Sequence, residues 1–411
     1  MSTTRRTVTK LIAAAALAPR GALATLAGTA RPSVDVAVIG AGVFGAWTAH
    51  ALHAAGLSVT LLDAYGPGNS RSSSGGESRI TRSAYGDRDL YARWASESLQ
   101  AWKALAQRTG LALFENTGVL TIVPGGDRFA DDSSAVLARL GIRHERLSAD
   151  ATMRRFPQFR LLPTESAIFE PEGGALMARR AIQALVSELL SGGVEYRIGS
   201  VRTPSGSGKL ATIETEAGET ISAGRFVFAC GPWLPKVFPA LLKTRLRAQR
   251  AEVFFLGVPA GDTRFFAPAM PTWIDRGGMG DAYGFPSLDG RGCKLAVDAL
   301  DNPIDPDTGD RTVTAPYIAA MRSFVRQRIP GLSDAPIVET RVCQYEYAAD
   351  KNYLLDRHPD FTNVWIAGGG SGHGFKNGPM VGNYVARLIV DQAPAEPRFS
   401  VAPKPQTPAT M

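Results

Sequence analysis

The sequence predicts an α/β fold in which two domains are interleaved along the chain. Residues 34–63 have the order strand, glycine-rich turn, helix and strand, and residues 363–391 have the order strand, glycine-rich turn and helix. Two such units about 300 residues apart can serve one ligand only if the chain between them leaves the first sheet and returns to it. The length of 411 residues provides for about two or three domains.

The first unit carries the clearest motif. The apolar, β-branched run VDVAVI predicts a buried strand, a helically spaced segment follows it, and SVTLLD predicts the next strand. Gly40, Gly42 and Gly45 form G-x-G-x-x-G between strand and helix, and Asp63 ends the second strand. This arrangement is typical of a Rossmann-like dinucleotide site, where glycines admit a pyrophosphate to a helix N-terminus and the acid binds a ribose hydroxyl. A glycine-rich turn without a ligand is the alternative, which the complete βαβ context disfavours.

The positive charge of the chain is concentrated in its first residues. The formal net charge is +7, but residues 1–32 contain five basic and no acidic residues, which leaves +2 for the remainder. The sequence therefore gives no support for a nucleic-acid partner.

Residues 1–32 have the layout of a Tat-type export signal and linker. The pair Arg5-Arg6 precedes an Ala/Leu-rich run and the small-residue sites ALA and GTA, although Pro19 and Arg20 interrupt the run. We expect export to the periplasm in the folded, cofactor-loaded state; the alternative is a disordered extension on a cytoplasmic protein. Neither this run nor any later stretch is long and apolar enough to span a membrane.

Cys230, Cys293 and Cys343 are the three cysteines of the chain. An odd, sparse set without C-x-x-C spacing predicts neither a disulfide framework nor a metal site. Cys343 lies in RVCQYEYAADKNYLLDRHP, among charged and aromatic residues, whereas a structural cysteine prefers apolar neighbours.

Four segments carry a resemblance to a known family: SSGGESRITRSAYGD (73–87), GFPSLDGRGCKL (284–295), VCQYEYAADKNYLLDRHP (342–359) and GSGHGFKNGP (370–379). With them, residues 33–391 resemble the monomeric sarcosine oxidase family. That family is a branch of the D-amino-acid-oxidase-like flavoproteins and includes N-methyltryptophan, pipecolate and fructosyl-amino-acid oxidases. The resemblance implies a Rossmann-like FAD-binding domain interleaved with a mainly antiparallel β-sheet substrate domain, α+β in character.

These expectations divide the chain into segments. They are an FAD-binding domain over 33–112, 173–245 and 341–395, a substrate domain over 113–172 and 246–340, and a flexible tail over 396–411. Further predicted elements are a helix over 88–109, a turn followed by a helix over 169–185, strands over 113–123, 251–256 and 293–297, and a strand that runs into a Gly-Pro turn over 224–233.

The resemblance implies roles for several residues. Cys343 matches the cysteine that the family joins to the flavin 8α-methyl carbon by a thioether, which suits a nucleophilic thiolate; the alternative is an inert buried cysteine, as we expect for Cys230 and Cys293. Lys294 matches the lysine that contacts flavin N5 through water and promotes oxygen reduction; its alternative is a surface lysine at a strand edge.

The remaining matched residues concern the substrate and the flavin. Arg82 and Lys376 match the family's carboxylate-binding cations and Arg79 an arginine near the flavin, the alternative for each being a solvated charge. Tyr283 and Tyr345 are expected to line the substrate pocket unless they are core residues. The expected cofactor contacts are Gly40, Gly42, Val43, Phe44, Gly45, Asp63, Ser74, Arg79, Cys343, Gly370, Gly372, His373, Gly374 and Lys376; a purely structural His373 is the alternative for that residue.

One departure bears on the substrate. Four residues after Lys294, sarcosine oxidases carry a histidine near the substrate, and this chain has Asp298. We therefore expect a substrate other than sarcosine, bound in part by Asp298.

The implied activity is FAD-dependent oxidation of the C–N bond of a secondary amino acid, N-alkyl or cyclic, to an imine, with oxygen reduced to hydrogen peroxide. The implied partners are a small amine and oxygen, and a monomer fits family members of this size. The alternatives are a dehydrogenase that passes electrons to a quinone or cytochrome, and a flavin-binding subunit without turnover.

Overall fold

The computed structural model describes residues 34–277, 282–297 and 302–402. The predicted export signal, Asp298 and the last residues of the predicted tail lie outside these ranges. No helix within the described ranges is long and apolar enough to cross a bilayer.

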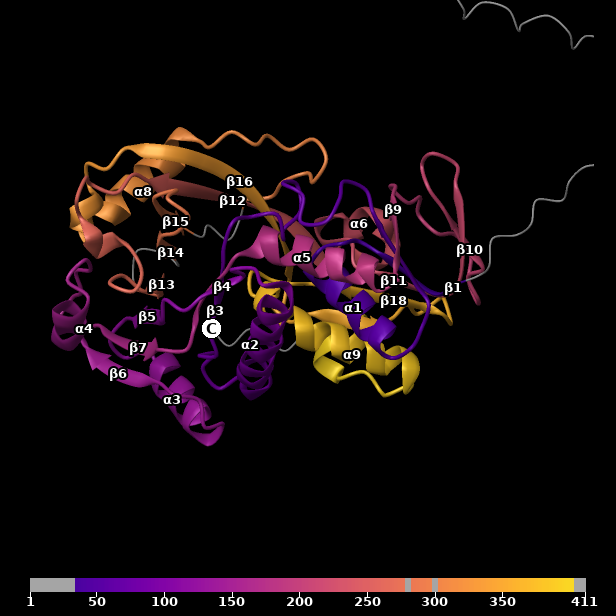
Figure 1. Ribbon diagram of the computed structural model, residues 1–411, viewed down its shortest axis with the longest axis horizontal. Coiled ribbons are helices and arrows are strands. Elements are labelled where there is room, and N and C mark those ends of the chain that lie inside the picture. Colours follow the sequence, from indigo (N-terminus) through magenta and orange to yellow (C-terminus); the bar gives the residue numbers. More distant parts are fainter. Residues whose placement is uncertain (1–33, 278–281, 298–301, 403–411) are drawn as a thin grey trace, which may run out of the picture. The chain divides into compact units, whose positions relative to one another are not determined.

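The first sheet is the parallel sheet that the sequence predicts. Its strands are β1 (Val34–Ile39), β2 (Val59–Asp63), β9 (Glu195–Ile198), β10 (Thr212–Glu214), β11 (Thr220–Phe228), β17 (Leu354–Arg357) and β18 (Val364–Gly368). They lie in the order β17-β18-β11-β1-β2-β9, with β10 beside β11 (Figure 1). The pairs from β18 to β9 are parallel, whereas β17 and β10 pair antiparallel with their neighbours. The C-terminal β18 thus returns to the sheet that β1 opens, as interleaving requires.

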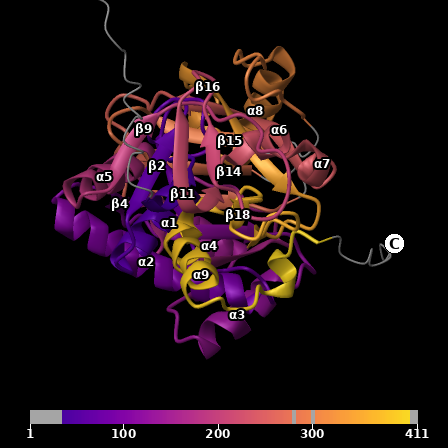
Figure 2. The same cartoon turned by 90° about the vertical axis from the view of Figure 1, so that its right-hand side faces the viewer.

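Four helices accompany this sheet: α1 (Val43–Ala54), α2 (Asp89–Thr109), α5 (Ala178–Ser191) and α9 (Gly378–Val390). The prediction of a helix over 88–109 is confirmed by α2. α1 packs against α5 and α9, and Figures 1 and 2 show α1 and α9 side by side. Their contact requires Gly382, because a Cβ at this position would lie 2.4 Å from the backbone of Trp47.

The second sheet is mostly antiparallel. Its order is β16-β12-β15-β14-β13-β5-β7-β6, and within it only β13 and β5 pair in parallel. The strands are β5 (Val119–Val123), β6 (Glu145–Ser148), β7 (Ser166–Glu170), β12 (Leu246–Leu256), β13 (Thr272–Asp275), β14 (Ala282–Ser287), β15 (Cys293–Val297) and β16 (Ile337–Ala348). The predicted mainly antiparallel second sheet is therefore confirmed, while the residue boundaries of the two domains stay a prediction.

A small third sheet and five further helices complete the described elements. The third sheet has the order β3-β8-β4, antiparallel throughout. These elements are β3 (Arg79–Thr81), β4 (Phe114–Glu115), β8 (Gly174–Leu176), α3 (Phe129–Arg139), α4 (Ala149–Arg155), α6 (Leu234–Val237), α7 (Pro239–Leu242) and α8 (Ala315–Arg328). The single strand predicted over 113–123 is wrong: it is β4 and β5, which belong to different sheets because Gly118 between them turns the chain at φ +68°.

A buried ion-pair cluster ties α8 to the second sheet. The Nε of Arg328 lies 2.5 Å from Asp275 Oδ2, and its Nη2 lies 2.7 Å from Glu165 Oε1. All three side chains are at most 7% exposed. Removing one member of such a cluster strongly destabilises the fold, because the charge of its partner would remain buried without compensation.

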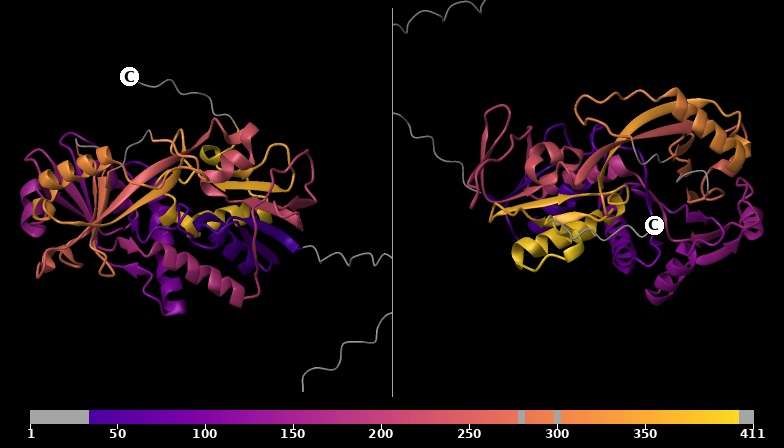
Figure 3. Two further views of the ribbon diagram at one scale, coloured as in Figure 1. Left: turned by 90° about the horizontal axis from the view of Figure 1, so that it is seen from above. Right: turned by 180° about the vertical axis from the view of Figure 1, so that it is seen from behind.

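The long pair β12 and β16 positions the site. The two strands pair from Leu246 opposite Ala348 to Leu256 opposite Ile337, and Figures 1 and 3 show them reaching from the second sheet toward the first. At the end of β16, Ser371 N donates to Glu346 O at 2.7 Å. The glycine-rich turn after β18 is thereby fastened to the strand that carries Cys343.

Candidate active site

The G-x-G-x-x-G turn lines a cavity of about 320 Å³ at the end of β1. Gly40 has φ +109°, and a Cβ there would lie 2.3 Å from Ala229 O, so the turn requires glycine. Val43 N, at the start of α1, donates to Ser74 Oγ at 3.0 Å. The cavity is thus bounded by a backbone without side chains and by the N-terminus of a helix, which together favour a phosphate group.

Asp63 lies at the edge of this cavity, at the end of β2. Its carboxylate accepts hydrogen bonds from the amides of Ala41, Tyr65 and Gly66 at 2.8 to 2.9 Å. Burial raises the pKa of Asp63, although these amides act in the opposite direction. The carboxylate therefore holds the turn that surrounds the cavity, in the position expected of the ribose-binding acid.

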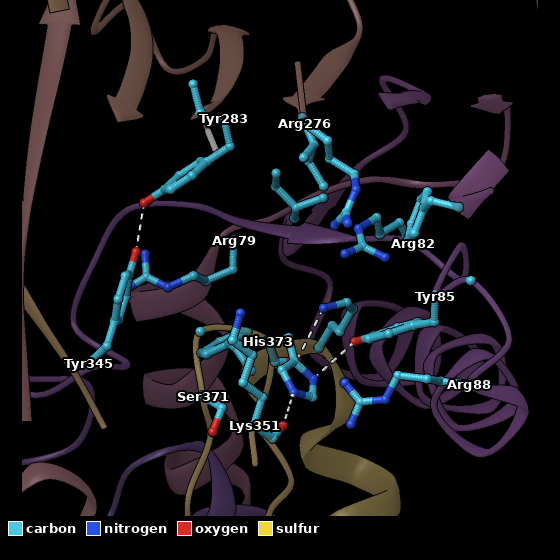
Figure 4. A pocket seen from close by; sticks show the side chains of 18 of the residues that line it. Arg79, Arg82, Tyr85, Arg88, Arg276, Tyr283, Tyr345, Lys351, Ser371 and His373 are labelled. Carbon is cyan, nitrogen blue, oxygen red and sulfur yellow. Dashed lines mark hydrogen bonds between the residues drawn. The ribbon is translucent and has the colours of Figure 1, made fainter. Parts of the chain in front are cut away.

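A larger cavity of about 560 Å³ lies among residues from β3, β14, β16 and the turn after β18 (Figure 4). A passage of about 90 Å³ has residues in common with both cavities: Val43, Phe44 and Ser74 with the first, Arg79 and Tyr345 with the second. The three spaces therefore form a continuous series from the glycine-rich turn to the larger cavity.

Most of the predicted site residues fall into groups along this series, whereas Lys294 and Cys343 line none of its three spaces. Gly40, Gly42, Val43, Phe44, Asp63 and Ser74 line the first cavity, Gly370, Gly372 and Gly374 line the passage, and Arg79, Arg82, Tyr283, Tyr345, Gly372, His373 and Lys376 line the larger cavity. Gly45 packs beneath the turn, where a Cβ would lie 1.8 Å from Gly40 O. Asp298 lies outside the described residues.

Lys294 is buried on β15 and is only 3% exposed, so it is not a surface lysine. Its Nζ donates to Ser78 O at 2.9 Å and to Ser78 Oγ at 3.3 Å, and lies 5.0 Å from the ring centroid of Phe285. Burial, and then the charge of Arg79, lower the pKa of Lys294 to about 7. The side chain is therefore poised between its charged and neutral forms near neutrality.

Arg79 lies on β3, beside Lys294. Its guanidinium donates to Ser78 O at 2.8 Å and to Ser73 O at 2.5 Å. Arg79 itself lines the passage and the larger cavity, so these bonds hold a cation at the junction of those two spaces.

Cys343 is 6% exposed on β16, opposite Ala251. It lies near both Arg79 and Lys294. Because side chains alternate along a strand, Cys343 shares a face with Tyr345, which lines the larger cavity. Burial raises the pKa of Cys293 to about 12 and also raises that of Cys230, as suits two inert cysteines.

The two predicted pocket tyrosines are in contact. Tyr283 from β14 and Tyr345 from β16 share a hydroxyl–hydroxyl hydrogen bond of 2.6 Å on one wall of the larger cavity (Figure 4). Burial, and then Tyr345, raise the pKa of Tyr283 well above its usual value, so this wall is neutral and aromatic.

Arg82 and Lys376 both lie close to the aromatic ring of Tyr85. The Arg82 guanidinium carbon lies 4.7 Å and Lys376 Nζ 5.1 Å from the ring centroid. Lys376 Nζ donates to His373 O at 3.1 Å. Burial, and then the charge of Arg82, lower the pKa of Lys376 well below its usual value. An anion that bound here would relieve this repulsion.

His373 is held in one tautomer. Its Nε2 lies 3.0 Å from Lys351 O, which can only accept, so Nε2 carries the hydrogen and Nδ1 accepts from Tyr353 Oη at 3.0 Å. Burial lowers the pKa of His373 well below its usual value, so the ring is neutral. His373 thus orders the glycine-rich turn through hydrogen bonds.

The structure adds residues that the sequence did not single out. Arg276, Arg88 and Tyr347 also line the larger cavity, and Glu346 lines the passage. Glu346 is buried, and burial raises its pKa to about 7 against the amides of Gly369 and Gly370. Tyr347 and Glu346 lie within the quoted segment around Cys343, but nothing local in the sequence marks Arg276.

Comparison with known proteins identifies the family. The profile described as DAO, FAD dependent oxidoreductase, matches residues 35–388. The chain belongs to this family of FAD-dependent oxidoreductases. It is 31% identical to the monomeric sarcosine oxidase of Bacillus sp. (strain NS-129), over 86% of this chain and 92% of that protein. It is 30% identical to the peroxisomal sarcosine oxidase of Homo sapiens, over 90% of this chain and 94% of that protein.

The solved structure of an L-proline dehydrogenase from P. horikoshii has the same fold, with a TM-score of 0.76 and 21% identity over 90% of this chain and 97% of that one. Together, the family match and the two sarcosine oxidases identify the chain as an FAD-dependent amine or amino-acid oxidase of the sarcosine-oxidase type, as the sequence predicts.

The described residues fit FAD. The glycine-rich turn and the start of α1 would hold the pyrophosphate, and the passage leads from them past Arg79 to the larger cavity. Glu346 Oε1 is buried without a hydrogen-bond partner among the described residues. It could accept a hydrogen bond from a hydroxyl or N–H group of a ligand in the passage. The first cavity would thus hold the nucleotide part of FAD, and the larger cavity would hold the substrate.

Proposed function

We propose that this oxidoreductase converts the C–N bond of a secondary amino acid, N-alkyl or cyclic, to an imine and reduces oxygen to hydrogen peroxide. Each turnover removes a hydride equivalent and a proton from the amine, and oxygen receives both electrons and both protons. The imine is then hydrolysed by water. The similarity to two sarcosine oxidases supports the reaction type.

The observation that carries the proposal is the meeting of Arg82 and Lys376 over Tyr85 in the larger cavity. A guanidinium can grip a carboxylate with two hydrogen bonds, and an ammonium adds a point charge. The same cations disfavour a positively charged amine nearby, so the substrate would bind as the free amine that oxidation requires.

Bound FAD would supply the acceptor for the two electrons taken from the amine. The chain's own residues then have distinct roles. We assign Cys343 to covalent attachment of the cofactor, and Lys294 with Arg79 to a positive charge that favours electron transfer to oxygen. Tyr283 and Tyr345 shape the pocket wall, and Asp298 is a further proposed substrate contact.

We also propose that the protein is exported to the periplasm by its Tat-type signal with the cofactor already loaded. The support is the Arg5-Arg6 pair and the apolar run that follows it. Replacing both arginines by lysine should leave the flavoprotein in the cytoplasmic fraction. Equal periplasmic amounts of the two forms would contradict the assignment.

The first test is anaerobic bleaching of the flavin band by a panel of amines. The panel includes sarcosine, other N-methyl amino acids, proline, pipecolate, fructosyl amino acids and primary D-amino acids. We expect bleaching by secondary amino acids, and a weakening of substrate binding of at least tenfold in Arg82→Met with the flavin retained. Arg264→Met, in which an exposed cation outside the cavity is removed, is the control.

Readmission of air then tests the acceptor. Rapid return of the flavin band with stoichiometric peroxide supports oxygen as the acceptor. Slow return that a quinone or cytochrome accelerates would instead favour a dehydrogenase. Absence of bleaching by every member of the panel, with FAD bound, would contradict the proposed reaction.

A further inference from the structure

A second arginine faces the larger cavity beside Arg82. Arg276 follows directly after β13, and both arginines line the cavity (Figure 4). Arg82 Nη1 and Arg276 Nε are buried, and neither has a hydrogen-bond partner among the described residues. Guanidinium N–H groups buried in this way are costly, and each would be satisfied by an acceptor on a bound anion.

Nearby acids only partly compensate these two charges. Asp127 Oδ2 lies 3.9 Å from Arg276 Nε, beyond hydrogen-bond distance. Glu170 is buried near Arg82, but its two oxygens accept from the amides of Ser83 and Ala84 at 2.6 and 3.1 Å. Burial, and further the charge of Arg276, lower the pKa of Arg82, so the two guanidinium groups repel each other.

The lining of the whole cavity is strongly cationic. Its described charged residues are Arg79, Arg82, Arg88, Arg128, Arg276, Lys351 and Lys376 against Asp87, Asp127 and Asp132. A single carboxylate between Arg82 and Lys376 leaves Arg276 Nε without a hydrogen-bonded acceptor among the described residues. Arg276 is also positioned by an aromatic ring, because its guanidinium carbon lies 4.2 Å from the ring centroid of Phe129.

We propose that the substrate is a dicarboxylic secondary amino acid, whose second carboxylate binds Arg276. This inference rests on the proposed function for the reacting amine and for the first carboxylate, which Arg82 and Lys376 would hold. Arg276 would then be a specificity-determining residue: it would select N-alkyl derivatives of acidic amino acids over neutral ones of the same length.

Binding of acids that cannot be oxidised tests the subsite without turnover. Calorimetry on the FAD-loaded protein would compare succinate, glutarate and adipate with butyrate and pentanoate. We expect the best dicarboxylate to bind at least tenfold more tightly than either monocarboxylate. In Arg276→Gln this advantage should disappear while monocarboxylate binding stays within about twofold, and Arg276→Lys should restore part of the advantage.

Arg264→Gln, which removes an exposed cation outside the cavity, is the matched control and should leave both affinities unchanged. Thermal melting and flavin content confirm that each variant is folded. If Arg276→Gln does not fold, Arg276→Met provides the same comparison, with Arg276→Lys again as the variant that keeps the charge. Equal affinity for dicarboxylates and monocarboxylates in the unaltered protein, or equal weakening of both in the variants, would overturn the proposal.

Turnover separates this inference from the proposed function. N-methylaspartate and N-methylglutamate, as both enantiomers, would be compared with N-methylasparagine and N-methylglutamine. We expect at least a tenfold preference for the acids, expressed in KM and lost in Arg276→Gln. Bleaching by acid and amide alike, unaffected by Arg276→Gln, would overturn the inference alone. Tight dicarboxylate binding that depends on Arg276, without bleaching by any amine, would overturn the proposed function and leave the subsite standing.

Discussion

Replacing Lys294 by Met measures the free energy that this buried charge costs. The pKa of Lys294 is about 7 in the folded chain and 10.5 in the unfolded one, mainly because of burial. Between these values the unfolded chain binds more protons, so stability rises with pH across this window. The penalty is present in full below about pH 7 and disappears above about pH 10.5.

The size of the effect follows from the pKa difference. At about 1.4 kcal/mol per unit, the penalty is about 5 kcal/mol at pH 6, about 3 kcal/mol at pH 8 and about 1 kcal/mol at pH 10. Lys294→Met removes this penalty and also the hydrogen bonds from Lys294 Nζ to Ser78, whose carbonyl oxygen keeps Arg79 as a donor. The lost bonds cost about 1 kcal/mol at every pH. The variant should therefore be more stable than the unaltered protein at pH 6 and no more stable, or less stable, at pH 10.

Urea unfolding of the two proteins at pH 6, 8 and 10 tests this change in sign. Lys209→Met, which removes an exposed ammonium, is the matched control and should show no such trend. A difference between Lys294→Met and the unaltered protein that does not depend on pH would refute the reasoning, since it would mean that Lys294 does not change its protonation between the folded and unfolded states in this range.

The other predictions concern attachment, electron transfer and packing. Cys343→Ser should release all flavin on acid precipitation, while the unaltered protein keeps its yellow colour; release from both would contradict the thioether. In stopped flow, Lys294→Met should slow reoxidation by air far more than reduction by substrate, and equal slowing would argue against its role with oxygen. Arg328→Met should lower the free energy of unfolding by about 3 to 5 kcal/mol, because Glu165 and Asp275 remain buried without their cation.

The fold could be predicted from the sequence where local signals agree. The βαβ unit around Gly40 combines two apolar strands, a helical spacing and a glycine motif, and all of them lie where they were expected. The prediction of a single strand over 113–123 was wrong because the apolar residues of this segment have a continuous strand-like spacing. Only the conformation of Gly118 divides it, and a glycine does not reveal its φ angle in the sequence.

The site was predictable in part, for a related reason. Arg79 and Arg82 are separated by two residues in one matched segment, and Lys376 lies in another. Short-range motifs were therefore sufficient to single them out. Arg276 comes to the cavity through the pairing of β13 with β14 and β5, which no short segment encodes. Glu346 also escaped notice, because an acid between two tyrosines on a strand is expected to face solvent, and burial of its face depends on the turn after β18.

At both the cofactor end and the substrate end of the site, burial and a neighbouring arginine lower the pKa of a lysine. Lys294 has a pKa lowered first by burial and then by Arg79, and Lys376 has one lowered first by burial and then by Arg82. A bound anion would therefore stabilise each pair of cations, Lys294 with Arg79 and Lys376 with Arg82. A phosphate or carboxylate that binds next to either pair gains the free energy of this relieved repulsion, and raises the pKa of the lysine as it does so. Binding of a carboxylate beside Lys376 should accordingly be accompanied by proton uptake. Calorimetry of glutarate binding in buffers of different ionisation enthalpy measures that uptake directly, and binding without any proton uptake would show that the lysines are already charged in the absence of ligand.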